Sequence, residues 1–356
     1  FKTLRTVRTT ERVGRKSMSE NLEKRRKERL DRGIKVRSDG LYALMSWREL
    51  GYLVLPRLVL IVGMLILPLV MPSMYWQRVI SKVCIYALLA LSFDFLAHFV
   101  GLVSLGGAFF IGTGGYIAAI LNTSFGLPPL LTIPLATIIG ASFCTLLLLP
   151  CLPLRGVYFA IITLMYPLLL ARVIEALDIL GGTDGILGVE SFLNRWMEQY
   201  VIIMMVLLFL FGVRRLVIKD IGLVFRAVKD NDQAVRASGI SITYYKTIAV
   251  FIASAMGCLG GAYMVHLYMW AGLSMFALDF SILPIAATVI GGSGTLVGPV
   301  LGAFILVPIS ELLRAFGTLR IVFYALILLA FIIFRSEGLL VYSQRKYQQF
   351  EKWVKV

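Results

Sequence analysis

Residues 201–211 read VIIMMVLLFLF, eleven apolar residues inside an uncharged stretch that runs from 199 to 213. An α-helix needs about 20 predominantly apolar residues to cross the hydrocarbon core of a bilayer. Comparable runs recur along the chain, among them TIAVFIASAMGCLGGAYMV at 247–265. Because these runs are continuous and not alternating, they predict membrane helices and exclude the strand pattern of a membrane β-barrel.

The composition supports the same fold class. Hydrophobic residues make up 59% of the 356-residue chain and charged residues 15%, whereas a soluble domain carries about 25% charged residues. We therefore predict an all-α, polytopic membrane protein with about ten transmembrane helices. The expected spans are 52–72, 79–99, 105–122, 128–150, 156–177, 199–216, 247–269, 280–291, 295–313 and 320–335. They form a membrane domain over 51–335, between an N-terminal tail (1–50) and a C-terminal tail (336–356).

The distribution of positive charge predicts the orientation. Residues 1–50 hold fifteen Lys and Arg against seven acidic residues. With this tail on the cytoplasmic side, the inside segments collect 28 Lys and Arg and the outside segments collect five. Because basic residues favour the cytoplasmic face, both termini and the loop 213–246 are expected in the cytoplasm. The formal net charge of +15 then indicates contact with anionic lipid and no nucleic-acid partner.

The segment 280–313 leaves two arrangements open. Neither half reaches 20 residues, and GGSG at 291–294 interrupts it. It is either two short spans or a re-entrant pair of half-helices, and both return the chain to the same side.

The loop 213–246 contains a charged stretch, FRAVKDNDQAVRASGI at 225–240. Ile221, Val224, Phe225 and Val228 follow the i, i+3, i+4, i+7 spacing of one helical face. In SGI at 238–240, the glycine can adopt a positive φ and end the helix. The pattern predicts a short amphipathic helix, gripped by a partner protein or lying on lipid headgroups.

Five segments in order resemble one family, the permease subunits of branched-chain amino-acid ABC importers (LivM-like). They are GLVSLGGAFFIGTGGY (101–116), LRGVYFAIITL (154–164), GGTDGI (181–186), RAVKDNDQAVRASGI (226–240) and GGSGTLVGPVLGA (291–303). The family's larger, ten-helix architecture and a bacterial inner-membrane location are what this resemblance implies.

The resemblance also implies partners. The family assembles two permease subunits, here with a LivH-like paralogue expected as the second, with two ABC ATPase subunits and an extracytoplasmic substrate-binding protein. The amphipathic helix then corresponds to the coupling helix that sits in a groove of the ATPase. Its expected contact residues are Phe225, Arg226, Val228, Asp230, Asp232, Ala234, Arg236 and Gly239. Because this sequence has no G-x-x-x-x-G-K-[ST] phosphate loop, the chain is expected to have no cofactor and no catalytic activity of its own, with ATP and Mg bound by the ATPases.

Two glycine-rich segments, 101–116 and 291–303, lie one in each half of the chain. Paired Gly- or Pro-interrupted spans point to a transport path built from broken helices. The alternative is close helix packing through small residues. Candidate residues of the translocation path are Asp94, Ser104, Gly106, Gly107, Thr113, Gly292, Ser293 and Gly298. Ser104 and Thr113, or Ser293 and Thr295, are expected to satisfy freed backbone groups.

Asp94 is expected to face the interior of the bundle, because a carboxylate in a membrane span costs about 2.5–3.5 kcal/mol. It pairs there with other protein groups or contacts substrate. Many family members have Asn at this position and His at position 107, where this chain has Gly. These departures leave the cargo open between branched-chain or other small apolar amino acids and the urea, short amides or aromatic acids that relatives carry.

An ion-coupled secondary transporter is the rival function. Such a carrier needs a relay of membrane carboxylates and cations, and this chain offers only scattered ones. The two histidines, His98 and His266, and the four cysteines lie apart in sequence, and this spacing predicts neither a metal site nor an enzyme.

Overall fold

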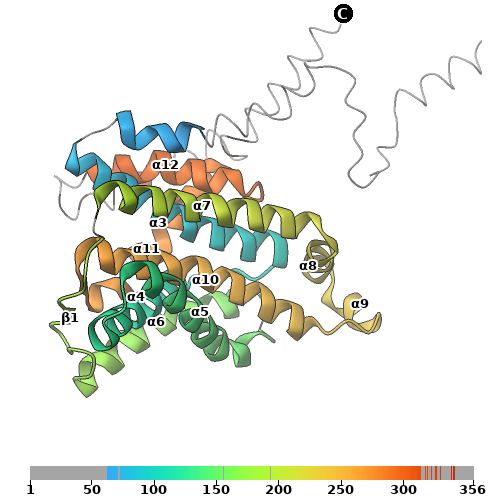
Figure 1. The fold of residues 1–356 in the computed structure, drawn as a ribbon. Coiled ribbons are helices and arrows are strands. Elements are labelled where there is room, and N and C mark those ends of the chain that lie inside the picture. Colours follow the sequence, from blue (N-terminus) through green and yellow to red (C-terminus); the bar gives the residue numbers. More distant parts are fainter. Residues whose placement is uncertain are drawn as a thin grey trace, which may run out of the picture. The chain divides into compact units, whose positions relative to one another are not determined.

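The computed structural model describes residues 62–70 and 73–313, except 155 and 193, together with 317, 319, 322, 325, 326, 329, 338 and 340. Within them the regular secondary structure is helical apart from two short strands, and loops connect these elements (Figure 1). Most of the span expected at 320–335, most of the one at 52–72, the N-terminal tail and most of the C-terminal tail lie outside the described residues. Residues 62–70 are helical.

The elements are labelled as in Figure 1. In chain order they are α3 (Met74–Asp94), the π-helix η1 (Phe95–Val100), α4 (Gly107–Phe125), α5 (Pro129–Leu148), the 3₁₀-helix η2 (Leu149–Cys151), α6 (Val157–Leu177), β1 (Ile186–Leu187), α7 (Arg195–Ile218), α8 (Asp220–Asp230), α9 (Asp232–Ala237), α10 (Ile242–Tyr268), β2 (Trp270–Ala271), the 3₁₀-helix η3 (Leu273–Phe276), α11 (Asp279–Gly291) and α12 (Val297–Leu312).

Six helices are long and apolar enough to cross a membrane: α3 with η1, α4, α5 with η2, α6, α7 and α10. They correspond to six of the ten expected spans, so the prediction of an all-helical polytopic protein is confirmed for the described residues. Two further expected spans, 280–291 and 295–313, correspond to the shorter apolar helices α11 and α12.

The six helices differ in how much protein surrounds them. The most apolar window of α3 is 83% buried and that of α10 is 78% buried, against 28% for α6. Tyr158, Met165 and Leu169 of α6 are exposed, as expected for side chains that meet lipid. Thus α3 and α10 form the centre of the bundle, and both extend toward its α8 end (Figure 1).

Glycines allow α4 and α10 to pack closely. A Cβ atom on Gly114 would overlap the backbone of Cys258, and one on Gly261 would overlap the carbonyl oxygen of Ile111. Small residues at a helix crossing let two backbones approach in this way. Several glycines of the first Gly-rich segment, Gly114 among them, therefore allow close helix packing.

The helices α11 and α12 form an antiparallel hairpin broken at residues 292–296. Their 13 and 16 residues give lengths of about 20 and 24 Å, short of the ~30 Å hydrocarbon core. A Cβ on Gly302 would overlap the carbonyl oxygen of Ala287. The predicted break is confirmed, and the hairpin packs too tightly to admit side chains between its arms.

Candidate functional site

The loop 213–246 holds two short helices where the sequence predicts one. The helix α8 ends at Asp230, and α9 begins after Asn231, whose φ is −157°. The Asn231 side-chain oxygen accepts the N–H groups of Gln233 and Ala234, each at 3.1 Å. Asparagine is among the best N-cap residues, so this residue starts α9 and separates it from α8. Gly239 ends α9 with φ +81°, and the predicted positive φ is confirmed.

The apolar face of α8 packs into this chain's own bundle. Phe225 is fully buried and Val228 nearly so. The ring of Phe225 meets Phe95 edge-on at 5.7 Å and Tyr245 at 6.3 Å. The expectation that Phe225 and Val228 contact an ATPase groove is therefore wrong, because the bundle already covers both side chains.

The charged residues of this loop remain on the surface. Asp230, Ala234, Arg236 and Gly239 are exposed, and Asp232 is half-buried. These five leave a polar surface at the end of the bundle formed by α8 and α9 (Figure 1). A partner that binds there meets these charged groups and Ala234, and α8 also exposes the apolar side chains of Ile221 and Leu223.

Arg226 and Lys229 of α8 turn toward the π-helix η1. The Arg226 guanidinium carbon lies 5.7 Å from the centroid of the Phe99 ring. The Lys229 ammonium donates a hydrogen bond to the carbonyl oxygen of His98 at 2.9 Å. Gly101 ends η1 with φ +80°, and a Cβ there would lie 3.0 Å from the Cγ of Lys229. Only a glycine combines this backbone conformation with so close a lysine stem.

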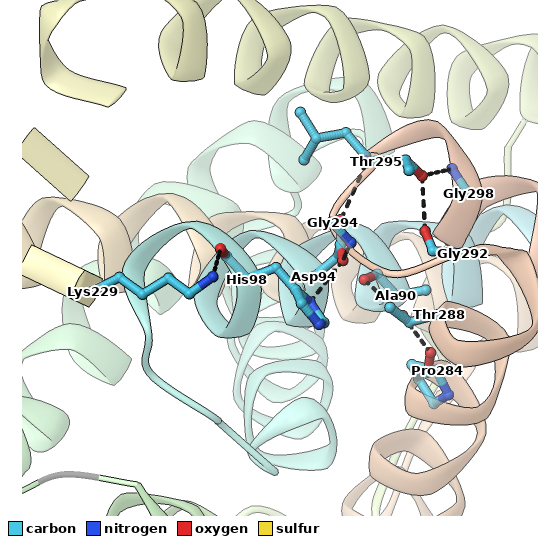
Figure 2. Close-up of polar contacts among 11 residues, drawn as sticks. Ala90, Asp94, His98, Lys229, Pro284, Thr288, Gly292, Gly294, Thr295 and Gly298 are labelled. Carbon is cyan, nitrogen blue, oxygen red and sulfur yellow. Dashed lines mark hydrogen bonds and ion pairs between the residues drawn. The ribbon is translucent and has the colours of Figure 1, made fainter. Parts of the chain in front are cut away.

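Asp94 is fully buried at the end of α3, which confirms that it faces the interior. Oδ1 accepts the N–H of Gly294 at 2.6 Å, and Oδ2 accepts the N–H of Leu296 at 3.1 Å (Figure 2). The Nδ1 atom of His98 lies 2.9 Å from Oδ1, within ion-pair distance. The carboxylate thus holds the turn between α11 and α12, so Asp94 pairs with protein groups and does not line an open path.

The second Gly-rich segment forms that turn. Gly292 has φ +114° and Gly294 has φ +77°. Thr295 donates to the carbonyl oxygen of Gly292 at 2.8 Å and accepts the N–H of Gly298 at 2.9 Å, so it satisfies freed backbone groups as predicted. Ser293 is exposed.

Gly298 is buried where α12 meets the turn. A Cβ on it would overlap the carbonyl oxygen of Gly292. The expectation that Gly298 borders a transport path is therefore wrong, since its hydrogen atom faces backbone.

The first Gly-rich segment contacts α6 and α11. Ser104 accepts the N–H of Gly106 at 3.3 Å, and a Cβ on Gly106 would lie 3.5 Å from Thr163. Gly107 packs against the carbonyl oxygen of Phe280. Thr113 is buried and donates to the carbonyl oxygen of Phe109 at 2.7 Å, so its hydroxyl group is satisfied within α4.

A pocket of about 500 Å³ opens at the end of α3 opposite to α8. At its wall the Lys82 ammonium lies 2.9 Å from the Glu311 carboxylate, with side-chain exposures of 25% and 10%. Met264, Leu283 and Val307 supply apolar lining. We call this space the outer pocket. It combines apolar walls with a few polar groups, which is typical of small-molecule sites.

A second, smaller cavity follows along the same helices. Its volume of about 10 Å³ suffices for about one water molecule. Ser104, Gly107 and Pro284 line it, together with Leu89 and Phe93 of α3. We call it the inner cavity.

The ring of Phe280 lines both spaces and stacks on Tyr86 with 5.5 Å between centroids. Lys82, Tyr86, Leu89 and Phe93 share one face of α3 by helical spacing, so the two spaces follow that face. No sequence pattern indicated this pair, because Tyr86 and Phe280 lie outside both Gly-rich segments. Of the path candidates, Ser104 and Gly107 line the inner cavity.

Comparisons with known proteins match most of the chain. Residues 75–334 match the family described as branched-chain amino acid transport system / permease component. The high-affinity branched-chain amino acid transport system permease protein LivM of Salmonella typhimurium is 28% identical over 287 residues, which covers 72% of this chain and 68% of the relative. The protein of that name from Escherichia coli is 26% identical over 314 residues, covering 79% and 74%. A probable branched-chain amino acid transport permease protein LivM from Methanocaldococcus jannaschii is 26% identical over 224 residues, covering 59% and 65%. No solved structure matches.

Proposed function

The chain belongs to the family of branched-chain amino acid transport permeases, and from this membership we propose that it forms half of the translocation pathway of an ATP-driven importer. It is a non-catalytic, multi-pass membrane subunit of an ABC transport system. The proposed path follows the face of α3 and α11 that carries the outer pocket and the inner cavity. This alignment of two cavities along one pair of helices is the observation that carries the proposal.

The chemistry of the outer pocket favours amino acids as cargo. A zwitterion presents an ammonium and a carboxylate group, and the pocket presents charges of both signs, Lys82 with the carboxylates of Glu311 and Asp279. The apolar walls suit an aliphatic side chain. Urea and short amides carry no charge to match the ion pair, so branched-chain or other small apolar amino acids fit better.

The remaining subunits are proposed on the same premise. Two ABC ATPases bind ATP and Mg and contact the polar surface of α8 and α9. A second permease, a LivH-like paralogue, completes the path, and an extracytoplasmic protein delivers cargo to the outer pocket. In this orientation the α8 end faces the cytoplasm of a bacterial inner membrane.

An ion-coupled carrier has less support. Asp94 would be the first carboxylate to serve such a carrier, but both of its oxygens accept backbone N–H groups of the turn 292–296. Releasing them would leave buried backbone donors without a partner.

The test is reconstitution of the chain with its partner subunits in proteoliposomes. We expect uptake of radiolabelled leucine that requires ATP and the binding protein. Unlabelled valine and isoleucine should compete with leucine, and urea and acetamide should not. Uptake driven by an ion gradient without ATP would instead support the carrier, and competition by urea would overturn the proposed cargo.

A further inference from the structure

The π-helix η1 lies between the two parts of the molecule that an importer must connect. On one side it contacts α8, which carries the surface proposed for the ATPase. On the other side, the residue that precedes it holds the turn of the α11–α12 hairpin (Figure 2). Single π-turns inside long helices are uncommon and occur frequently at functional sites.

The contact between α8 and η1 involves three side chains of α8. Phe225 packs on Phe95, Arg226 lies over Phe99, and Lys229 bonds to the carbonyl oxygen of His98. Because these three side chains contact Phe95, His98 and Phe99 of the six-residue η1, we expect a displacement of α8 to displace η1 with it.

The contact between η1 and the hairpin depends on Asp94. Its two oxygens accept N–H groups from Gly294 and Leu296, 200 and 202 residues later in the chain. Charge-assisted hydrogen bonds of this kind are roughly twice as strong as neutral ones. Leu296 has φ +61°, a conformation that a leucine adopts only when its surroundings impose it. The carboxylate is part of those surroundings.

The hairpin carries the movement on to the pocket. Its arms meet backbone to backbone at Gly291, Gly298 and Gly302, so they shift together. Phe280 at the start of α11 and Ser310 near the end of α12 both line the outer pocket. A shift of the turn would therefore also move Phe280 and Ser310 at the other end of the hairpin.

We propose that η1 transmits movement of α8 to the α11–α12 hairpin, with Asp94 as the positioning residue that joins them. This inference rests on the proposed function, because it needs a partner that moves α8. The π-helix is the segment where the two contacts meet, and single π-turns are frequent at functional sites.

The test measures coupling apart from assembly. The variants Asp94→Asn and Lys229→Met are each built into the complete importer in proteoliposomes. Asparagine keeps the shape of Asp94 but loses the charge and one acceptor. Methionine keeps much of the Lys229 stem that lies on Gly101 and loses the bond to His98. Lys219→Met is the matched control, an exposed lysine at the start of the same helix.

We expect Asp94→Asn to lower leucine uptake per ATP hydrolysed by about tenfold, the loss expected from a charged hydrogen bond. Lys229→Met should lower it by about threefold, less because its ammonium is exposed. Yield of the complex and ATP hydrolysis should stay near the level of the unmodified importer. The double variant should be no worse than Asp94→Asn, because both changes interrupt one route.

A reporter in the hairpin gives an independent measurement. Ser310→Cys places a thiol in the outer pocket, and the four native cysteines are buried, so background labelling is low. The rate of maleimide labelling at this position should change when ATP is added. In Asp94→Asn most of that change should disappear while ATP hydrolysis continues.

Other outcomes contradict the inference. Unchanged uptake per ATP in both variants would place the transmission elsewhere. Loss of the complex in Asp94→Asn would make Asp94 a stabilising residue only, and losses that multiply in the double variant would mean two separate effects. An unmodified importer that takes up leucine without ATP would overturn the proposed function itself, and this outcome is recognised before any variant is compared.

Discussion

Tyr86 of α3 and Phe280 of α11 stack almost in parallel, with 17° between their rings, at the point where the outer pocket meets the inner cavity. Each ring buries apolar surface on the other, and such pairs contribute about 0.5–1.5 kcal/mol beyond that burial. The pair separates a pocket with room for a small amino acid from a cavity with room for about one water. Because Phe280 lines both spaces, the pair lies between them on the proposed path.

Removing one ring should open this constriction. We expect Phe280→Ala to join the two spaces and to raise ATP-independent leakage of radiolabelled leucine from loaded proteoliposomes by about tenfold, since 1.4 kcal/mol of lost stacking corresponds to that factor. Tyr86→Phe keeps the ring and serves as the control. Leakage that does not change in Phe280→Ala would show that the pair lies off the path.

The ion pair between Lys82 and Glu311 permits a swap experiment. Exchanging the two residues, Lys82→Glu with Glu311→Lys, keeps an ion pair at the pocket wall but reverses its direction. If the pair recognises a zwitterion, we expect normal yield of the complex and a KM for leucine uptake raised by about tenfold, the cost of one misplaced charged contact. If the pair only stabilises the helices, the swap should restore uptake that Lys82→Met alone reduces.

The left-handed conformation of Gly239 fixes how α9 joins α10. A β-branched residue resists positive φ, so Gly239→Val should distort this turn and lower ATP-driven leucine uptake by several-fold, as about 1–2 kcal/mol of strain implies. Asparagine tolerates the conformation, and Gly239→Asn should retain most of the uptake. Equal loss in both variants would assign the effect to the added side chain and not to the backbone. Normal uptake in Gly239→Val, or with Asp230 and Arg236 both reversed in charge, would contradict coupling through α8 and α9.

Gly298 and Gly106 should respond differently to the same small change. A Cβ on Gly298 would overlap a carbonyl oxygen, whereas one on Gly106 would find its nearest neighbour, Ser104 Oγ, at 3.3 Å. We expect Gly298→Ala to destabilise the hairpin by about 1–3 kcal/mol and to lower the yield and melting temperature of the purified complex. Gly106→Ala should leave both near normal. Similar melting temperatures for the two variants would contradict the tight packing of α11 on α12.

Features set by local chemistry could be predicted from the sequence. Continuous apolar runs predict helices because the bilayer demands length, and six of them are confirmed. The conformation of Gly239 follows from its place after a helical pattern. The GGSG break is likewise local, because glycines that adopt positive φ end a helix wherever they occur.

Features set by distant neighbours could not be predicted. Helical spacing identified the apolar face of α8, but spacing does not say whether a partner or the chain itself covers that face. Phe225 meets Phe95, 130 positions earlier, and no local pattern marks this contact. The π-helix has no sequence signature of its own. The stacking of Tyr86 on Phe280 depends in the same way on how far apart α3 and α11 come to rest.

The bonds of Asp94 also bear on how the protein is made. Gly294 and Leu296 follow Asp94 by 200 and 202 residues. The ribosome therefore synthesises α3 long before it synthesises these two residues. During that interval the carboxylate lacks both N–H groups and, of the contacts described above, has only the one with His98, four residues further along. A carboxylate within the bilayer costs about 2.5–3.5 kcal/mol. We therefore expect the newly inserted α3 to sit shallower, with Asp94 nearer to water. We expect synthesis of the α11–α12 turn to let α3 reach its final depth, so that a late segment of the chain completes the membrane insertion of an early one.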